Sequence, residues 1–291
     1  MVHIMRFKRV LAALTCGLLA VSLLSACGGS KKNYVILEKS LADEDYGIGF
    51  RKADQTLRDE VERLLVEMNK DGKFEEISKK WFNTNVSKLP DSFTAAESDD
   101  TSLADIKSAG KLRVGLDVAL PPMGFRNEDG EIDGFDIDLA KEVCRRMGVE
   151  AEFIPIDWTK KERELDANKI DCIWNGYTIS DERKEKVNMT DPYMGNRQVL
   201  VVMEGSPVKT PDDLKDKTLT LQDSSTASDA LDANPAIKAL VSGGEANKVA
   251  DNVTALLELS LGKCDAVLMD ETVAQYYVSH KNQIKAAESQ E

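Results

Sequence analysis

The 291-residue sequence has few histidines and no excess of basic residues, and these two shortages remove several classes of function. Histidine occurs only at His3 and His280, which is too few for a zinc site or a histidine-based nucleophilic triad. The formal net charge is −13, whereas binding to nucleic-acid phosphates needs a basic face. We therefore expect neither a metal centre nor a nucleic-acid partner.

Other patterns that would indicate catalysis or membrane insertion are also missing. After the N-terminal segment no apolar run reaches about 18 residues, so no later segment is expected to span a bilayer. We find no phosphate-cradling GxxxxGK loop and no nucleophile beside a base, so we expect a protein without a cofactor that is not an enzyme. The five cysteines show no CxxC spacing, and Cys144 and Cys172 are predicted to be small buried side chains among apolar neighbours.

The N-terminus carries the pattern of an export signal. A basic start precedes the apolar run Val10–Leu24, which is typical of a signal peptide. The sequence Leu-Ser-Ala-Cys at positions 24–27 resembles a bacterial lipobox. It predicts a lipoprotein signal peptide over 1–26, lipid on Cys27 and a lipidated tether over 27–32. The alternative is a plain secretory signal with an incidental cysteine. We expect an exported protein held on the outer face of the cell membrane, periplasmic in cells with two membranes, through this lipid alone.

The rest of the chain changes its pattern near residue 100. Apolar periodicity predicts a helix that Asp54 caps and Gly72 ends, and a second helix before residue 83. Residues 83–100 lose this periodicity and are predicted to be a linker. Short strands then alternate with helices, which predicts an α/β fold with a mostly parallel sheet. Ligands of such sheets bind beyond the carboxyl ends of the strands.

Polar and aromatic side chains stand where the predicted strands end. They are Asp117, Trp158, Gly176, Thr178, Arg183, Ser225, Thr226 and Asp270. An arginine can hold a carboxylate through two hydrogen bonds, and amides at a helix start bind the same anion. An aspartate can hold an ammonium group, and an aromatic ring can cover a cation or an apolar stem. This inventory suits a zwitterion, so a free amino acid is the predicted ligand.

Several of these stretches resemble the amino-acid class (family 3) of solute-binding proteins of bacterial ABC importers. The resemblance is carried by residues 111–117 (KLRVGLD), 134–139 (GFDIDL), 171–183 (DCIWNGYTISDER) and 191–193 (DPY). It implies a two-lobed fold like that of type II periplasmic binding proteins, in which each lobe is a mostly parallel sheet flanked by helices. It also implies two hinge crossings and delivery of the ligand to the membrane permease of an ABC importer.

The resemblance assigns each site position a role along the ligand. Arg183 and the Thr226 amide, helped by Thr178, would hold the α-carboxylate, and Asp270 and the Gly176 carbonyl would hold the α-ammonium. Leu120 and Trp158 would cover the two faces of the side chain, and Asp117 would meet its far end. Ser225 stands beside Thr226 at the same helix start, where capping and anion binding use the same amides. Taken singly, Arg183 also fits a solvated helix face, Asp270 and Ser225 fit helix caps, and Trp158 fits the core. We nevertheless expect Trp158, flanked by polar residues, to stay partly exposed.

The candidate ligands follow from Asp117. A carboxylate at the far end favours a polar or cationic side chain, such as that of lysine, arginine, ornithine or glutamine, and a cystine-like ligand also fits. Acidic amino acids are disfavoured because Asp117 would oppose their second carboxylate. The family commonly has an aromatic residue where Leu120 stands, so this sequence departs from the family where the ligand side chain would lie and not at the zwitterion site.

One segment stands in an unexpected place. Residues 34–82 resemble the C-terminal end of the family, which suggests a circular permutation whose original ends are joined through 83–100. Lobe 2 would then comprise 33–44 and 200–285, and lobe 1 would comprise 46–192. The crossings would be 46–52 and 193–201. The alternative is a fusion of two decayed gene copies that pair by domain swapping. We favour the permutation, and with it a monomer.

Two other functions stay open at this point. One is an enzyme on the same fold, such as a periplasmic prephenate or arogenate dehydratase with Asp117 as the acid. The other is a sensory or adhesive lipoprotein, which predicts no tightly bound ligand.

Overall fold

The computed structural model describes residues 33–280. The predicted signal peptide, the lipid-bearing Cys27 and its tether lie outside the described residues, as do residues 281–285 of predicted lobe 2. Among residues 33–280, no helix has the length and apolar character needed to cross a membrane.

Ten strands form one sheet in the spatial order β12-β11-β13-β10-β2-β8-β3-β7, with β1 paired to β10 and β9 paired to β2. Their bounds are β1 Tyr34–Ile36, β2 Ala42–Phe50, β3 Lys111–Leu116, β7 Glu150–Pro155, β8 Cys172–Thr178, β9 Asn188–Met189, β10 Met194–Met203, β11 Leu219–Gln222, β12 Asn247–Val249 and β13 Ala266–Asp270. A second, small sheet consists of β4 Ala119–Leu120, β5 Gly124–Arg126 and β6 Ile132–Asp133.

Helices flank this sheet. The α-helices are α1 Gln55–Asp71, α2 Lys73–Phe82, α3 Ser102–Ala109, α4 Phe135–Met147, α5 Lys161–Asp166, α6 Asp181–Lys186, α7 Thr226–Asp232, α8 Pro235–Lys238, α9 Asn252–Ser260 and α10 Glu271–Ser279. Three short 3-10 helices are η1 Trp158–Lys160, η2 Pro211–Leu214 and η3 Ser242–Gly244.

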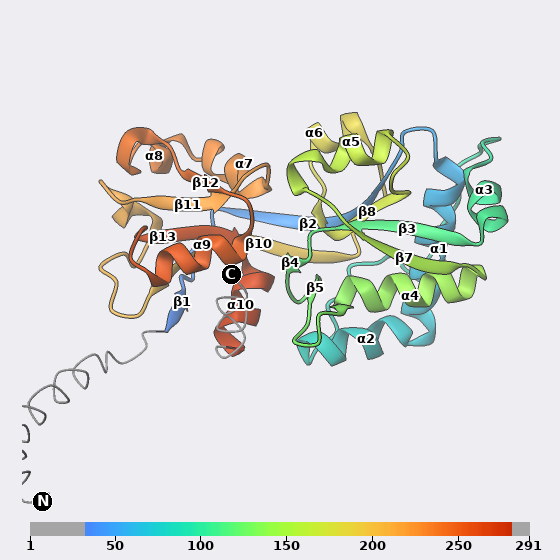
Figure 1. The fold of residues 1–291 in the computed structure, drawn as a ribbon, viewed down its shortest axis with the longest axis horizontal. Coiled ribbons are helices and arrows are strands. Elements are labelled where there is room, and N and C mark those ends of the chain that lie inside the picture. Colours follow the sequence, from blue (N-terminus) through green and yellow to red (C-terminus); the bar gives the residue numbers. More distant parts are fainter. Residues whose placement is uncertain (1–32, 281–291) are drawn as a thin grey trace, which may run out of the picture. The chain divides into compact units, whose positions relative to one another are not determined.

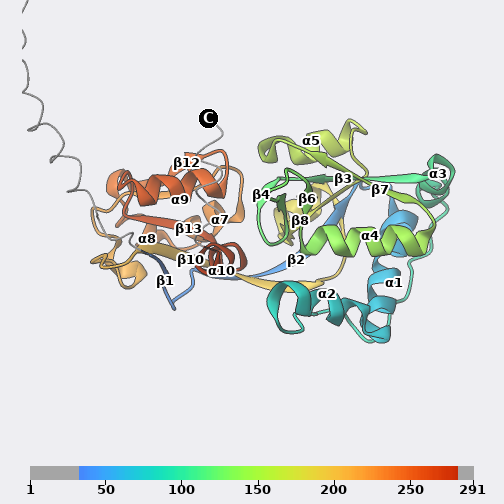
Figure 2. The ribbon, with the colours of Figure 1, turned by 60° about the horizontal axis from the view of Figure 1, so that its bottom comes forward.

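Figures 1 and 2 show that these elements gather into two lobes. We call the half that holds β3, β7 and β8 lobe 1, and the half that holds β11, β12 and β13 lobe 2. The three strands in each set are parallel, as the alternation of strands and helices predicts. The antiparallel strands β2 and β10 run between the lobes. They pair with each other from Tyr46↔Met194 to Ala42↔Gln198. On β2, the paired residues 42–46 lie mostly before the predicted crossing at 46–52.

Residues 34–50 are an integral part of the sheet. Strand β1 pairs with β10, and β2 lies between β10 and β8. Residues 83–100 contain no helix or strand apart from an isolated bridge between Ser87 and Met194. The segment before residue 83 supplies β2, which is one of the two strands that connect the lobes, and it also supplies α1 and α2 of lobe 1.

The ends of α1 confirm one prediction and correct another. Gly72 ends the helix in the left-handed conformation, at φ 85°, as predicted. Asp54 does not cap it, because its carboxylate pairs with Arg51 at 2.7 Å. The cap comes from Asp100, whose Oδ2 accepts a hydrogen bond from the Thr56 amide at 2.9 Å. The end of the linker thus closes the start of a helix more than forty residues away in the chain.

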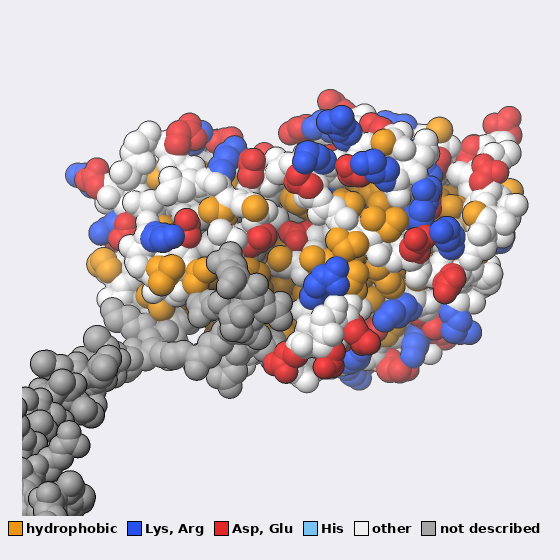
Figure 3. All heavy atoms as spheres, viewed as in Figure 1, with side chains coloured by type: hydrophobic (Ala, Val, Ile, Leu, Met, Phe, Trp, Pro, Cys, Tyr) orange, Lys and Arg blue, Asp and Glu red, His pale blue; other side chains and the backbone are white. Residues whose placement is uncertain are grey.

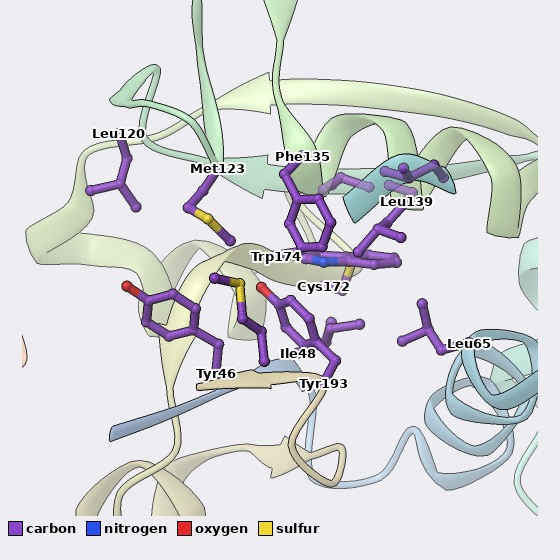
Figure 4. Close-up of a cluster of buried hydrophobic side chains, with 14 of the residues drawn as sticks. Tyr46, Ile48, Leu65, Leu120, Met123, Phe135, Leu139, Cys172, Trp174 and Tyr193 are labelled. Carbon is purple, nitrogen blue, oxygen red and sulfur yellow. The ribbon is translucent and has the colours of Figure 1, made fainter. Parts of the chain in front are cut away.

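The largest cluster of buried apolar side chains packs the sheet of lobe 1 against α1, α2 and α4 and continues into lobe 2 through α9, β13 and α10. Figure 4 shows a part of this cluster. Trp174 is fully buried among Phe135, Leu139 and Tyr193. Cys144, Cys172 and Cys264 are free thiols and all buried, which confirms the prediction for the first two. On the face shown in Figure 3, acidic and basic side chains are interspersed over both lobes.

Candidate functional site

One cavity between the lobes is lined by residues from the carboxyl ends of the strands and from the loops that follow them. Its lining comprises Asp117, Leu120, Trp158, Asn175, Gly176, Thr178, Arg183, Gln222, Ser225, Thr226 and Asp270. All nine residues predicted to bind the ligand line it, and Asn175 and Gln222 are additions. Gln222 is the last residue of β11, so the rule about strand ends points to it as well.

Arg183 provides the positive end of the cavity. It is only 7% exposed although its neighbours on α6 are exposed, so the structure excludes a solvated helix face for this residue. Its Nη1 donates to the Thr178 carbonyl at 2.9 Å, and its guanidinium lies 4.4 Å from the centre of the Tyr177 ring. These two contacts hold the guanidinium in place before any ligand binds.

Lobe 2 faces Arg183 with the start of α7. The Thr226 hydroxyl donates to the Thr178 hydroxyl of lobe 1 at 3.3 Å. Ser225 occupies the N-cap position of α7, but its hydroxyl donates to the Gln222 carbonyl at 2.8 Å. The side chain of Ser225 therefore does not serve as the predicted cap, which leaves the amides at the start of α7 to bind other acceptors.

Asp270 provides the negative end of the cavity. It stands at the N-cap position of α10, yet its Oδ1 accepts hydrogen bonds from the Tyr46 hydroxyl at 2.9 Å, from Gln198 at 3.0 Å and from Asn196. Burial and, after it, the negative charge of Glu44 raise the pKa of Asp270. The predicted alternative of a simple helix cap does not describe this side chain.

Glu44 is a site residue that the sequence analysis missed. Its Oε2 accepts hydrogen bonds from Thr178 at 3.1 Å, from Asn196 at 3.1 Å and from Gln198 at 3.0 Å. It therefore connects the groups beside Arg183 with those beside Asp270. Glu44 stands in the acidic run 43–45, and nothing in that run distinguishes it from its neighbours.

The side-chain end of the cavity is formed around Asp117. Its Oδ1 accepts from the Ala119 amide at 2.9 Å, and its Oδ2 accepts from Gln222 of lobe 2 at 2.9 Å. Burial raises the pKa of Asp117. Leu120 and Trp158 are both buried in the cavity wall. Trp158 is only 8% exposed and packs edge-on against Tyr177, so the prediction that it stays partly exposed was wrong.

Lys161 is a second residue that the sequence analysis missed. It is 4% exposed, and its ammonium donates to the carbonyls of Trp158 and Ser224, both at 3.1 Å. Because Ser224 belongs to lobe 2, this bond joins the lobes beside the cavity. Burial lowers the pKa of Lys161 to about 8. Its place in a charged run at 160–164 hid this role, since such runs are usually solvated.

The cavity thus has the polarity of an amino-acid site, with a guanidinium at one end of the polar part and a carboxylate at the other. Within residues 33–280, no three or more His, Cys, Asp or Glu side chains are grouped as metal ligands.

Known proteins share both the sequence and the fold of this chain. The model of the bacterial extracellular solute-binding proteins, family 3, matches residues 112–280. The L-cystine-binding protein TcyJ of Escherichia coli (strain K12) is 33% identical over 186 residues, which cover 63% of this chain and 68% of that protein.

Two solved structures have the same two-lobed fold. An ABC uptake transporter substrate-binding protein from Streptococcus pneumoniae with bound histidine matches with a TM-score of 0.62 and 39% identity, over 65% of this chain and 77% of that one. The ancestral amino acid-binding protein AncCDT-1, a precursor of cyclohexadienyl dehydratase, matches with a TM-score of 0.56 and 33% identity, over 61% and 78%. With the family model matching more than half of its residues, this chain belongs to the bacterial extracellular solute-binding proteins of family 3.

Proposed function

We propose that this protein binds a free amino acid outside the cell membrane and delivers it to the permease of an ABC importer. The observation that carries this proposal is the placement of Arg183 and Asp270 in one cavity between two lobes. The charges of these side chains are opposite to those of the α-carboxylate and α-ammonium of an amino acid. Relatives of the same family bind cystine and histidine.

Each ligand group meets a matching protein group in this proposal. Arg183, with Thr178 and the amide of Thr226, holds the carboxylate, while Asp270 and the Gly176 carbonyl hold the ammonium. Gly176 adopts φ +53°, a conformation that favours glycine. A buried charge without a partner is costly, so the site favours a ligand that carries both charges.

The side chain of the ligand lies between Leu120 and Trp158 and ends at Asp117. We infer a polar or cationic side chain that donates hydrogen bonds, as in arginine, lysine, ornithine, glutamine, histidine or cystine. The side-chain amide of Gln222 donates its hydrogen bonds to Asp117 and to the Ala250 carbonyl. It therefore has no donor left for a second carboxylate on the ligand.

Capture proceeds by approach of the two lobes in this proposal. Hydrogen bonds from Gln222 to Asp117, from Lys161 to Ser224 and from Thr226 to Thr178 cross between the lobes around the cavity. The strands β2 and β10 are the connections about which the lobes would move. No chemical step is needed, and we propose that the protein is not an enzyme although AncCDT-1 is a dehydratase precursor.

We further propose that the chain is a circular permutant anchored by lipid on Cys27, with a signal peptide over 1–26. The matched family region starts at residue 112, yet residues 34–50 form strands of the same sheet. On this view 33–44 and 200–285 make lobe 2, and 46–192 make lobe 1. A rearranged chain with 33–82 placed after residue 280 should bind the same ligand as a monomer. A dimer in size-exclusion chromatography of the original chain would favour domain swapping instead.

The function is tested by a thermal-shift panel of the common amino acids on residues 28–291, confirmed by calorimetry. A ligand present at about 100 times its Kd should add about 2.7 kcal/mol of stability. We expect a shift with one or a few polar or cationic amino acids, and its loss in Arg183→Ala and Asp270→Ala. A folded monomer that responds to none of them would refute the proposal.

A further inference from the structure

Two carboxylates on different strands share the same hydrogen-bond donors in the ammonium end of the cavity. Strand β10 lies between β2 and β13, and its Asn196 and Gln198 donate to both Glu44 and Asp270. The register explains this arrangement, because Asn196 pairs with Glu44 and Gln198 pairs with Asp270. Residues two apart on a strand lie on the same face, so all four side chains meet on one side of the sheet.

The groups around this pair do not neutralise it. From β2, the Tyr46 hydroxyl donates to Asp270, and from β8 the Thr178 hydroxyl donates to Glu44. Strand β10 presents the neutral amides described above, and Thr272 of α10 contacts the Tyr46 hydroxyl at 3.3 Å.

The charged groups nearby are few. Arg183 on α6 is a cation that acts on Asp270, and it is the proposed partner of the ligand carboxylate. Asp229 on α7 interacts with both Glu44 and Arg183 and adds negative charge. Glu271, which follows Asp270, is paired with Arg197 at 2.7 Å. Burial and the neighbouring charge of Glu44 raise the pKa of Asp270, and the positive charge of Arg183 lowers it by less.

We propose that Glu44 is a positioning residue of the amino-acid site, and that its pairing with Asp270 makes ligand binding release a proton. This inference rests on the proposed function. Glu44 belongs to the N-terminal segment, outside the residues that the family model matches. It holds Thr178 on the carboxylate side and shares Asn196 and Gln198 with Asp270 on the ammonium side.

The proton balance of the step is simple. Without ligand, Asp270 holds a proton at pH values below its raised pKa. The amino acid arrives as a zwitterion, with its own proton on the nitrogen, and its ammonium supplies the positive charge that allows Asp270 to ionise beside Glu44. The proton of Asp270 leaves to solvent, so up to one proton is released for each ligand bound. A proton competes with the ligand, so affinity falls as the pH falls, by at most about tenfold per pH unit.

Isothermal titration calorimetry in buffers of different ionisation enthalpy counts these protons. The probes are L-arginine, L-histidine and L-cystine, each titrated into residues 28–291 over about pH 5 to 8. We expect release of a substantial fraction of one proton by the wild type below neutral pH. Glu44→Gln keeps an acceptor for Thr178 but removes the charge, while the burial of Asp270 remains. Its proton release should therefore be clearly smaller than that of the wild type, and its affinity should depend less on pH.

Asp45→Asn is the matched control. Asp45 is the next residue on β2, and its carboxylate pairs with Lys88 away from the site. This variant should release as many protons as the wild type. The proton count of the wild type tests the pair even if Glu44→Gln does not fold. Binding without proton release, or equal release by Glu44→Gln and the wild type, would overturn this inference alone. A folded wild type that binds none of the probes would overturn the proposed function and this inference with it.

Discussion

The two ends of the cavity differ in how many protein groups hold them. At the zwitterion end, Asp270 and Glu44 receive hydrogen bonds from side chains of three strands, and Arg183 is held by a carbonyl and a ring. At the side-chain end, Asp117 receives one amide from its own loop and one side chain from lobe 2. The part that every amino acid shares thus meets a highly connected site, whereas the part that varies meets few groups.

The largest expected effect is at the zwitterion end. Arg183→Ala would leave the ligand carboxylate without its buried cation, which costs about 2–5 kcal/mol, or about 30-fold to several thousandfold in Kd. Calorimetry with the ligand identified by the panel measures this loss. Lys184→Ala removes an exposed cation from the same helix and should bind like the wild type. Equal losses in the two variants would argue against a specific role for Arg183.

A change at the side-chain end should alter selectivity more than overall binding. Asp117→Asn removes the charge that a cationic side chain would meet, and the loss of a charged hydrogen bond is worth about 1.5–3 kcal/mol. We expect weaker binding of arginine and lysine, with glutamine affected much less. Competition assays among these amino acids measure the difference. Equal weakening of all three would place Asp117 in a purely structural role.

The buried carboxyl of Asp136, which holds the Gly176 amide in the cavity wall, should make the free energy of unfolding depend on pH. Asp136 is fully buried, accepts from the Gly176 amide and the Tyr193 hydroxyl, both at 2.8 Å, and burial raises its pKa to about 7. A carboxyl whose pKa is higher in the folded state stabilises the fold at low pH, and this contribution is lost as the pH rises through about 7.

Asp136→Asn should therefore reduce the decline in the free energy of unfolding between about pH 5 and 8, by an amount of about 2–4 kcal/mol. Urea titrations of the ligand-free protein at several pH values measure it. An unchanged slope in the variant would show that Asp136 does not control this decline.

The smallest expected effect concerns the bond between the lobes at Lys161. Lys161→Met keeps the length of the side chain but removes its hydrogen bonds to Trp158 and Ser224. We expect a loss of about 1–2 kcal/mol, or roughly tenfold in Kd, with a larger radius of gyration by small-angle scattering. The exposed Lys160→Met is the control. An unchanged Kd and an unchanged radius of gyration for Lys161→Met would show that Lys161 does not help to hold the two lobes together.

The predicted elements agree best with the structure where a local signal exists. Gly72 ends α1 in the left-handed conformation, as the sequence predicts, because glycine adopts this conformation without strain. The predicted cap of α1 was wrong because the residue that caps it, Asp100, is distant in the chain, and no local pattern connects Asp100 with Thr56.

The residues of the site also fall into those that a local signal in the sequence predicts and those that only the structure identifies. The sequence by itself determined that strands and helices alternate and which side chains stand at the strand ends. Because the carboxyl ends of parallel strands share one edge of a sheet, those nine residues line one cavity. Only the tertiary structure decided the parts played by Glu44 and Lys161. Gln198, the partner of Glu44, and Ser224, the partner of Lys161 in lobe 2, lie far away in the chain. These groups meet only through the register of β2 with β10 and the approach of the two lobes.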